Sequence, residues 1–195
     1  MPSIYVIDTE TTGLDGYFAG DLVVDIGICE VKIESGTVID VYSSVVGYDI
    51  SAWTEEQKHS WIFENTDLTV EAVAGAPSMK DVVASVSEIL SGKKVTSYNV
   101  GFDFDKFLNF PLWELRKIST IAPDIMLVAA NYCKIPGYYD QYKWPKLTEA
   151  YSALVPGDLA GINGKQDHRA LSDARMASYV MLALYEKGLY SPEGL

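Results

Sequence analysis

Long apolar runs, cysteine and positive charge are all scarce in this chain, and each shortage excludes a class of protein. The 195 residues contain no uncharged apolar stretch of about 18 residues and no basic-then-apolar leader, so we expect a soluble, cytoplasmic protein without a membrane partner. The two cysteines, Cys29 and Cys133, lie far apart and fit neither a metal-binding spacing nor a disulfide framework. Cys29 falls within an apolar strand pattern, which predicts a buried, unreactive thiol.

Lysine and arginine are outnumbered mainly in the first half of the chain. The net charge of −12 weighs against a polyanionic partner. Residues 1–97 carry 5 Lys or Arg against 16 Asp or Glu, whereas residues 98–195 carry 10 against 11. Bound metal would cancel part of the negative charge if paired carboxylates are its ligands. We therefore expect any contact with nucleic acid to be local, without long-range electrostatic steering.

Apolar residues, by contrast, are plentiful. Hydrophobic residues make up 48% of the chain and charged residues 22%, which is typical of a compact globular protein. The length suits one well-filled core, and the sequence shows no internal repeat and no low-complexity linker. We expect one domain over residues 1–195.

The spacing of the apolar residues predicts an α/β arrangement. Five strands are expected, the first starting at Ile4 and the others at 22–33, 38–46, 94–97 and 118–123. Five helices are expected at 78–91, 102–109, 124–132, 146–154 and 170–187. Residues 48–77 lack a clean period and should form short helices and loops. This order predicts a mixed sheet flanked by helices.

Two carboxylates end the first predicted strand. Because side chains alternate along a strand, Asp8 and Glu10 should point to the same side. Two adjacent carboxylates repel each other and are costly to desolvate, and a hard divalent cation with oxygen ligands would explain them. The Thr11–Gly13 segment that follows offers hydroxyl groups and a tight turn.

Two later segments carry further candidate residues. Asp103 falls in the first turn of a helix entered directly from a strand, and His168 and Asp173 lie five positions apart at the start of the last helix. Residues five apart on one helix project about 140° apart, so His168 must lie in the preceding loop if the two are to converge. Gly161 and Gly164 favour such a loop. Each residue alone also has an ordinary explanation, as a helix-start aspartate, a capping histidine or a solvated helix residue.

Taken together, these segments resemble the DnaQ-like, or DEDDh, family of 3′–5′ exonucleases. Three motifs match in order: Asp8-Thr9-Glu10-Thr11-Thr12-Gly13, Asn99-Val100-Gly101-Phe102-Asp103, and His168 with Asp173. Weaker matches are Val24-Asp25-Ile26-Gly27, Ala76-Pro77-Ser78 and Asp124. The resemblance extends from Ser3 to about Leu184 and implies a ribonuclease-H-like fold, with a mixed five-stranded sheet flanked by helices.

The resemblance implies metal-dependent catalysis. Four residues would bind two Mg²⁺ or Mn²⁺ ions and take part in catalysis: Asp8, Glu10, Asp103 and Asp173. His168 would be the general base on the attacking water, and Arg169 replaces the Tyr of the family's tyrosine version. Four residues would contact the terminal nucleotide or bases: Thr11, Thr12, Leu14 and Phe102.

The substrate implied by the resemblance is nucleic acid with a free 3′ end. We expect hydrolysis of DNA, preferably single-stranded, with release of 5′-mononucleotides. An RNA-trimming exonuclease would use the same residues, although Thr11 stands where oligoribonuclease-like members usually have Met. An inert exonuclease-like binding module is disfavoured because all five active-site residues are present.

Three parts of the chain depart from the family pattern or allow two interpretations. Thr66–Thr69 stands where the family usually has a His-x-Ile-Thr element. The resemblance allows a polymerase partner, but we expect no tail for one, because the last predicted helix ends near Lys187. The oligomeric state is left open. The tyrosine-rich loop at 132–144 could stack on single-stranded nucleic acid or cover a sheet edge.

Overall fold

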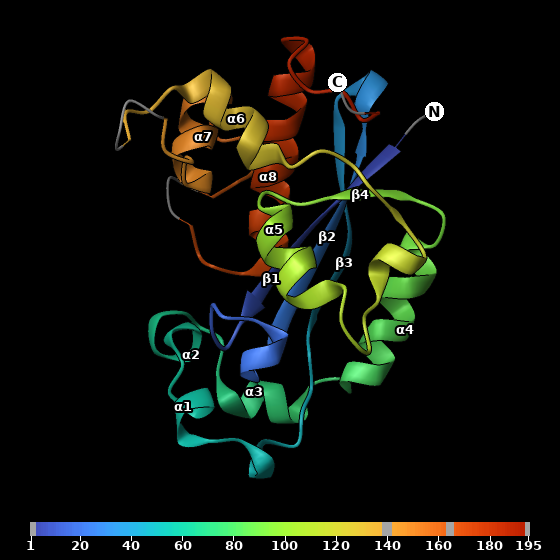
Figure 1. Cartoon of the computed structure of the whole chain (residues 1–195), viewed down its shortest axis with the longest axis vertical. Coiled ribbons are helices and arrows are strands. Elements are labelled where there is room, and N and C mark those ends of the chain that lie inside the picture. The colour runs from blue at the N-terminus through green and yellow to red at the C-terminus, as the bar shows by residue number, and fades with distance from the viewer. Residues whose placement is uncertain (1–2, 138–141, 163–165, 194–195) are drawn as a thin grey trace.

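The computed structural model, which describes residues 3–137, 142–162 and 166–193, is built around one mixed sheet (Figure 1). Its five strands are β1 (Ser3–Thr11), β2 (Val23–Lys32), β3 (Thr37–Val45), β4 (Lys94–Thr96) and β5 (Thr120–Ile121). They lie in the order β3-β2-β1-β4-β5. β1 pairs antiparallel with β2 and parallel with β4, which confirms the predicted mixed sheet of five strands.

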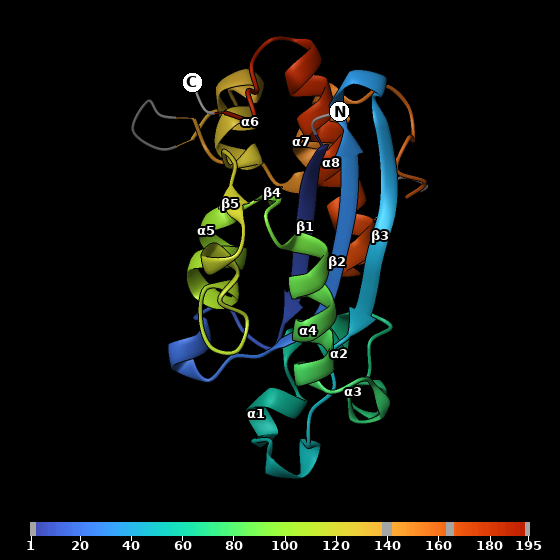
Figure 2. The same cartoon turned by 90° about the vertical axis from the view of Figure 1, so that its right-hand side faces the viewer.

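Helices cover both faces of this sheet (Figure 2). One face packs against α6 (Ile125–Cys133), α7 (Leu147–Leu154) and α8 (Ala170–Glu186). The other packs against α4 (Met79–Leu90), the single turn α5 (Val100–Phe102) and the π-helical segment Asp103–Leu108 that continues it. Within the part of the chain that the structure describes, none of the helices has the length and apolar character needed to cross a bilayer.

The alternation along β1 decides which face the carboxylates occupy. Ile4 and Val6 are buried in the core formed with α6, α7 and α8, whereas Ile7 is buried in the core formed with α4. Asp8 and Glu10 continue the series of Ile4 and Val6, and therefore lie on the face that α8 covers.

A third group of short helices lies at the end of the sheet where β1 finishes (Figure 1). It consists of α1 (Glu55–Lys58), α2 (Trp61–Asn65) and α3 (Val70–Gly75). Ile62 and Leu68 of this segment are buried with Val24 of β2 in a small separate core. The prediction of short helices and loops in residues 48–77 is confirmed.

Two predicted elements differ from the observed ones. The helix expected at 102–109 is mostly π-helical, because the N–H of Asn109 donates to the carbonyl of Phe104, five residues back. The strand expected at 118–123 is only Thr120–Ile121. Ile118 is held in the preceding turn by Leu115, and Pro123 has no N–H for a strand partner.

Cys29 lies in the core between β2 and α8. Its side chain is fully buried. Burial raises the pKa of the thiol to about 12, so it stays protonated and unreactive at neutral pH. This confirms the prediction of a buried, inert thiol.

Candidate active site

Asp8 and Glu10 reach the end of β1 side by side, as their spacing predicts. β1 and β4 are parallel, so the segment that follows β4 meets the carboxyl end of β1 at the same edge of the sheet. Glu10 lies directly opposite Asp25 of β2, and the strand register shifts immediately after Glu10. Three carboxylates are thereby placed close together.

Asp103 approaches from the segment after β4. It is buried, and Oγ1 of Thr9 donates a 2.7 Å hydrogen bond to its Oδ1. Two residues fix the preceding turn: Asn99 accepts from the N–H of Phe102, and Asp124 accepts a 2.7 Å bond from the N–H of Val100. The weak sequence match at Asp124 thus has a structural role, because it anchors the turn that carries Asp103.

The start of α8 packs directly on β2. A Cβ on Gly27 would lie 2.3 Å from the backbone N of Leu171, so only glycine allows this approach. Asp25, two residues earlier on the same face, accepts a 2.8 Å bond from Nε of Arg169 and a 3.2 Å bond from the N–H of Ala170. Together Gly27 and Asp25 fix where α8 begins.

His168 and Asp173 are placed by this helix start. His168 precedes the helix with a φ of 53°, a left-handed backbone conformation that a non-glycine residue rarely adopts. One ligand atom each from Glu10, His168 and Asp173 lie within 4.8 Å of one another. His168 therefore lies in the loop before α8 and converges with Asp173, as expected.

A cavity of about 210 Å³ collects these residues. It is lined by Asp8, Thr9, Glu10, Tyr98, Asn99, Phe102, Asp103, Leu147, Gln166, His168 and Asp173. The five residues predicted to take part in catalysis are thus brought together, and Phe102 lies beside them.

Thr11, Thr12 and Leu14 follow Glu10 in the chain but are not among the residues that line the cavity. Oγ1 of Thr11 donates to the carbonyl of Gly13, and Oγ1 of Thr12 accepts from the N–H of Leu22. Both hydroxyls therefore shape the loop after β1. Leu14 is 72% exposed, so its side chain is free to contact a bound molecule.

Burial and mutual repulsion make these carboxyl groups unusually weak acids. Desolvation raises the pKa of Asp8 well above its usual value, and Asp103 and Asp173 add to the shift. Desolvation, followed by repulsion from Asp173, raises the pKa of Glu10 to about 9. Desolvation also raises the pKa values of Asp103 and Asp173 to about 7. The site is therefore poised to accept positive charge.

The donor set fits a divalent metal ion. Among the residues that the structure describes, no group donates a hydrogen bond to Oδ1 of Asp173, although this oxygen is buried. A buried carboxylate oxygen without a partner is costly unless a cation occupies the site. Carboxylate oxygens are the ligands that Mg²⁺ and Mn²⁺ prefer. Asp8, Glu10, Asp103 and Asp173 could hold such ions.

Three residues of the site went unnoticed in the sequence. Gln166 donates to Oδ2 of Asp173. The Trp61 ring meets the His168 ring edge-on, with centroids 5.0 Å apart. Tyr98 lines the cavity and donates a 2.8 Å bond to the carbonyl of Pro145. Gln166 and Trp61 carry no local sequence signal, whereas Tyr98 directly precedes the Asn99–Asp103 motif.

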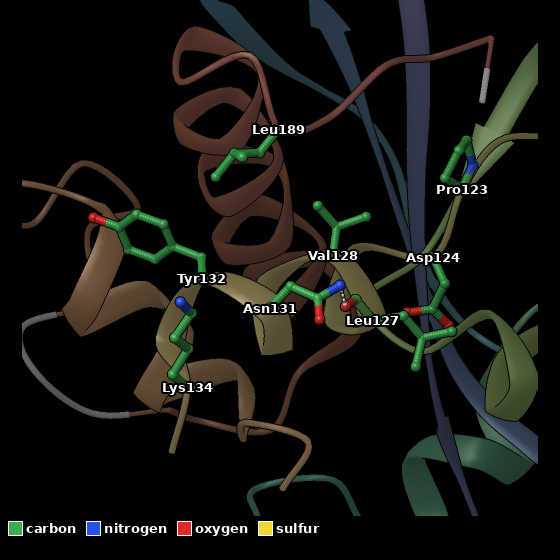
Figure 3. Close-up of a pocket in the computed structure, with 8 residues that line it drawn as sticks. All are labelled: Pro123, Asp124, Leu127, Val128, Asn131, Tyr132, Lys134 and Leu189. Atoms are coloured by element: carbon green, nitrogen blue, oxygen red, sulfur yellow. Dashed lines mark hydrogen bonds between the residues drawn. The ribbon is translucent and has the colours of Figure 1, made fainter. Parts of the chain in front are cut away.

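A larger pocket lies away from the carboxylates (Figure 3). Its volume is about 690 Å³, and Leu127, Val128, Tyr132 and Leu189 make it mainly apolar. Of the acidic residues discussed above it contains only Asp124, whose carboxylate already accepts from the N–H groups of Val100 and Leu127. The smaller cavity, which holds the titratable residues, is therefore the candidate active site.

Part of the tyrosine-rich loop, residues 138–141, lies outside the described residues. Tyr142 and Trp144 are exposed. Nζ of Lys143 donates to both carboxylate oxygens of Glu149 at 2.7 and 2.9 Å. This lysine therefore forms an ion pair with α7, and its charge is already neutralised by Glu149.

Comparison with known proteins agrees with this geometry. The family model described as RNase_T: Exonuclease matches residues 5–181. A DNA polymerase III PolC-type from Thermotoga petrophila is 27% identical over 183 residues, a match that covers 93% of this chain but 12% of that protein. The chain thus spans a small part of the polymerase. Uncharacterized exonuclease CP81 from Escherichia phage 186 is 28% identical over 194 residues, covering 93% of this chain and 88% of that protein.

Solved structures share the fold at low sequence identity. The nuclease domain of 3′hExo, a DEDDh family member bound to rAMP, has a TM-score of 0.66 at 15% identity, over 96% of this chain and 93% of that one. Exonuclease I from E. coli in complex with a dA16 oligonucleotide has a TM-score of 0.68 at 14% identity, over 99% and 42%. Because the family match extends over most of the chain and the fold is ribonuclease-H-like, this chain belongs to the DnaQ-like, DEDDh family of 3′–5′ exonuclease enzymes.

Proposed function

We propose that this chain is a metal-dependent exonuclease that removes 5′-mononucleotides from the 3′ ends of DNA, preferably single strands, with residues 1–195 acting as one exonuclease domain. One observation carries the proposal. Four carboxylates and a histidine, contributed by β1, the segment after β4 and the start of α8, surround one open cavity. The match to the exonuclease family model extends over residues 5–181 and so includes all five of these residues.

The carboxylates would hold the metal. Asp8, Glu10, Asp103 and Asp173 supply oxygen ligands, and their raised pKa values show that the folded chain disfavours four bare charges. Two bound Mg²⁺ or Mn²⁺ ions would supply an activated water and would stabilise the leaving 3′ oxygen.

His168 is the proposed general base. Burial lowers the pKa of its imidazole, so the ring is neutral at pH 7 and can take a proton from the attacking water. Two features orient it. The Trp61 ring contacts the His168 ring edge-on, and the backbone of His168 has a left-handed conformation ahead of α8. Arg169, the next residue, is bonded to Asp25, which keeps the backbone of this loop in place.

The substrate end is proposed to enter between Phe102 and the loop after β1. Phe102 lines the cavity and offers a ring face to a base. Leu14, which is largely exposed in the loop after β1, would offer an apolar contact to the terminal bases. Thr11 and Thr12 hold the backbone of this loop in shape.

DNA is the preferred substrate in this proposal. Two observations on similar proteins support it: a PolC-type DNA polymerase contains the matching segment, and Exonuclease I was solved with a dA16 oligonucleotide. The alternative is an exoribonuclease, which the similarity to 3′hExo bound to rAMP supports. The two differ in whether the site accepts a 2′-hydroxyl on the terminal nucleotide.

A degradation assay with three matched substrates tests the proposal. Single-stranded DNA, duplex DNA and RNA of one sequence, each labelled at the 5′ end, are incubated with Mg²⁺ or with chelator. We expect stepwise shortening from the 3′ end, fastest on single-stranded DNA and absent with chelator. Faster loss of RNA would favour the exoribonuclease. No degradation of any substrate with Mg²⁺ or Mn²⁺ would reduce the chain to a binding module.

A further inference from the structure

Three aromatic rings form an exposed cluster beside the active site, which we call the aromatic triad: Tyr17, Phe18 and Phe110. Tyr17 and Phe110 are stacked with ring centroids 5.2 Å apart and an interplanar angle of 3°. Phe18 meets Phe110 edge-on at 4.8 Å and Tyr17 at 5.5 Å. Phe18 is 85% exposed and Tyr17 42% exposed. Contiguous exposed apolar side chains mark a binding site more often than apolar residues that are exposed singly.

The turn that carries Tyr17 and Phe18 is held in place before any ligand binds. Oδ2 of Asp21 accepts 2.8 Å bonds from the N–H groups of Asp15 and Gly16. Gly16 has a φ of 96°, and a Cβ there would lie 2.9 Å from the backbone oxygen of Lys106. The loop is therefore packed tightly on the π-helical segment. A preorganised aromatic surface binds at lower entropic cost than a mobile one.

Continuous contacts connect the triad to the active-site cavity. Phe102 lines the cavity, and Nζ of Lys106 lies 5.7 Å from the centre of its ring. The same Nζ donates a 2.6 Å bond to the carbonyl of Leu14, in the loop that leads to the triad. In Figure 1 the Tyr17–Ala19 turn, in blue, lies next to the green segment that begins with α5. A strand leaving the cavity past Phe102 would reach Lys106 and then the triad.

The two segments that carry the triad are themselves almost uncharged, unlike the chain as a whole. Residues 14–21 and 105–117 together contain four acidic residues and three basic ones, a balance of −1, whereas the whole chain carries −12. The acidic ones are Asp15, Asp21, Asp105 and Glu114, and the basic ones are Lys106, Arg116 and Lys117. This region therefore repels a phosphate backbone less than the rest of the molecule does.

We propose that the aromatic triad is a base-stacking site for single-stranded nucleic acid, on the 5′ side of the nucleotide being removed. The proposal rests on the proposed exonuclease function and adds a second contact for the same strand. Every base has a π-face, so stacking on aromatic rings holds a strand without reading its sequence. Three rings are too small a surface for a stable protein partner, which buries about 800 Å² on each side. They match the size of one or two bases.

A length series tests this site. Single-stranded oligonucleotides of increasing length are hydrolysed by wild type and by Phe18→Ala, and kcat/KM is measured for each. We expect the variant's loss to grow with length and to reach about tenfold or more once the strand is long enough to reach the triad, the effect of losing one stacked base. Phe18→Trp should retain the wild-type length dependence, whereas Phe18→Leu, which is apolar without a π-face, should behave like Phe18→Ala.

Tyr185→Ala is the matched control. Tyr185 is 40% exposed and lies near Ser3, at the opposite end of β1 from the carboxylates, so this variant should match wild type at every length. A length-independent effect of Phe18→Ala, or full activity of Phe18→Leu, would overturn the stacking site. So would a concentration-dependent mass in sedimentation that Phe18→Ala abolishes, which would assign the triad to self-association. If wild type degrades no length at all, the exonuclease function itself is wrong.

Discussion

Asp8 is the carboxylate whose charge the folded chain disfavours most clearly. Desolvation and repulsion from four neighbouring carboxylates raise its pKa. We expect Asp8→Asn to lower turnover by more than about 10²-fold, because it removes a group that helps to stabilise charge in the transition state. The metal-free variant should melt at the same temperature as wild type or higher, because one source of repulsion is gone.

Activity assays and thermal melts in chelator check this expectation. Glu88→Gln is a suitable control, because Glu88 is an exposed carboxylate on α4 outside the cavity. It should change neither quantity. A fall of many degrees in the melting temperature of metal-free Asp8→Asn would indicate a structural network in place of a metal site.

His168 is the residue that should matter for rate more than for binding. We expect His168→Ala to reduce turnover by roughly 10²–10⁴-fold, the usual range for a positioned general base. The affinity for a 3′-terminal mononucleotide should hardly change, since His168 is not proposed as a metal ligand. Turnover and equilibrium binding are measured on the same preparation.

The chain's other histidine provides the comparison. His59 ends α1, and its side chain is 70% exposed near Glu55 and Glu64. His59→Ala should retain wild-type turnover. Nearly full activity of His168→Ala at neutral pH would rule His168 out as the base.

At the scale of elements, the contact between β2 and α8 determines whether the active site forms. A Cβ at position 27 would overlap the backbone at Ala170 and Leu171, at 2.3–2.4 Å. We expect Gly27→Ala to destabilise the fold by about 1–3 kcal/mol, as overpacking does. It should also lower activity beyond the loss of folded protein, because His168 and Asp173 move with the helix start. Denaturant unfolding and specific activity measure the two effects.

Gly75→Ala is the control for glycine replacement. A Cβ at Gly75, the last residue of α3, would meet nothing within 4 Å. This variant should be neutral or stabilising by up to about 1 kcal/mol. If Gly27→Ala behaved the same way, the tight approach of α8 would not be needed.

The elements that could be predicted from the sequence are those with a long, regular apolar period. α4, with Val82, Val86 and Leu90 buried, begins and ends within one residue of the prediction. The π-helical form of residues 103–108 could not be predicted, because an apolar pattern does not distinguish backbone hydrogen bonds that reach five residues back from those that reach four. The length of β5 was overestimated, because apolar residues continue in the sequence beyond the two residues that pair with β4.

The convergence of the candidate active-site residues was predictable because their chemistry is unusual for their positions. Asp8 and Glu10 are two carboxylates that an alternating strand places side by side, where they repel each other, and the motif spacing identified the others. The residues that hold them were less visible. Arg169 and Asp25 are 144 positions apart, and Trp61 meets His168 although the two residues also lie far apart in the sequence. Such pairs depend on tertiary packing, which leaves no periodic pattern in the sequence.

At the scale of the whole molecule, metal-free stability should depend on pH. The folded pKa values of about 9 for Glu10 and about 7 for Asp103 and Asp173 lie above their usual values of 4.5 and 3.8. Groups with raised folded pKa values stabilise the fold at low pH and lose that contribution as the pH rises through the folded pKa. We therefore expect the melting temperature in chelator to fall between about pH 5 and pH 9.

Added Mg²⁺ or Mn²⁺ should reverse this loss at the alkaline end. An ion that binds only the folded state stabilises it by mass action, by about 2.7 kcal/mol at a concentration 100 times its Kd. Melting curves at several pH values, with chelator and with metal, provide the measurement. A metal-free melting temperature that rises over this range would contradict the carboxylate repulsion, and an equal metal response in Asp8→Asn would place the ion elsewhere.

The proposed catalytic residues come from segments far apart in the chain, and this has a consequence for the protein while it is being synthesised. A chain that has emerged from the ribosome only as far as β5 contains Asp8, Glu10 and Asp103 but lacks His168 and Asp173. These two residues arrive with α8, whose side chains also complete the core on that face of the sheet. If the proposed function holds, the nascent chain should therefore lack part of its proposed active site until α8 has been synthesised and packs on this face of the sheet.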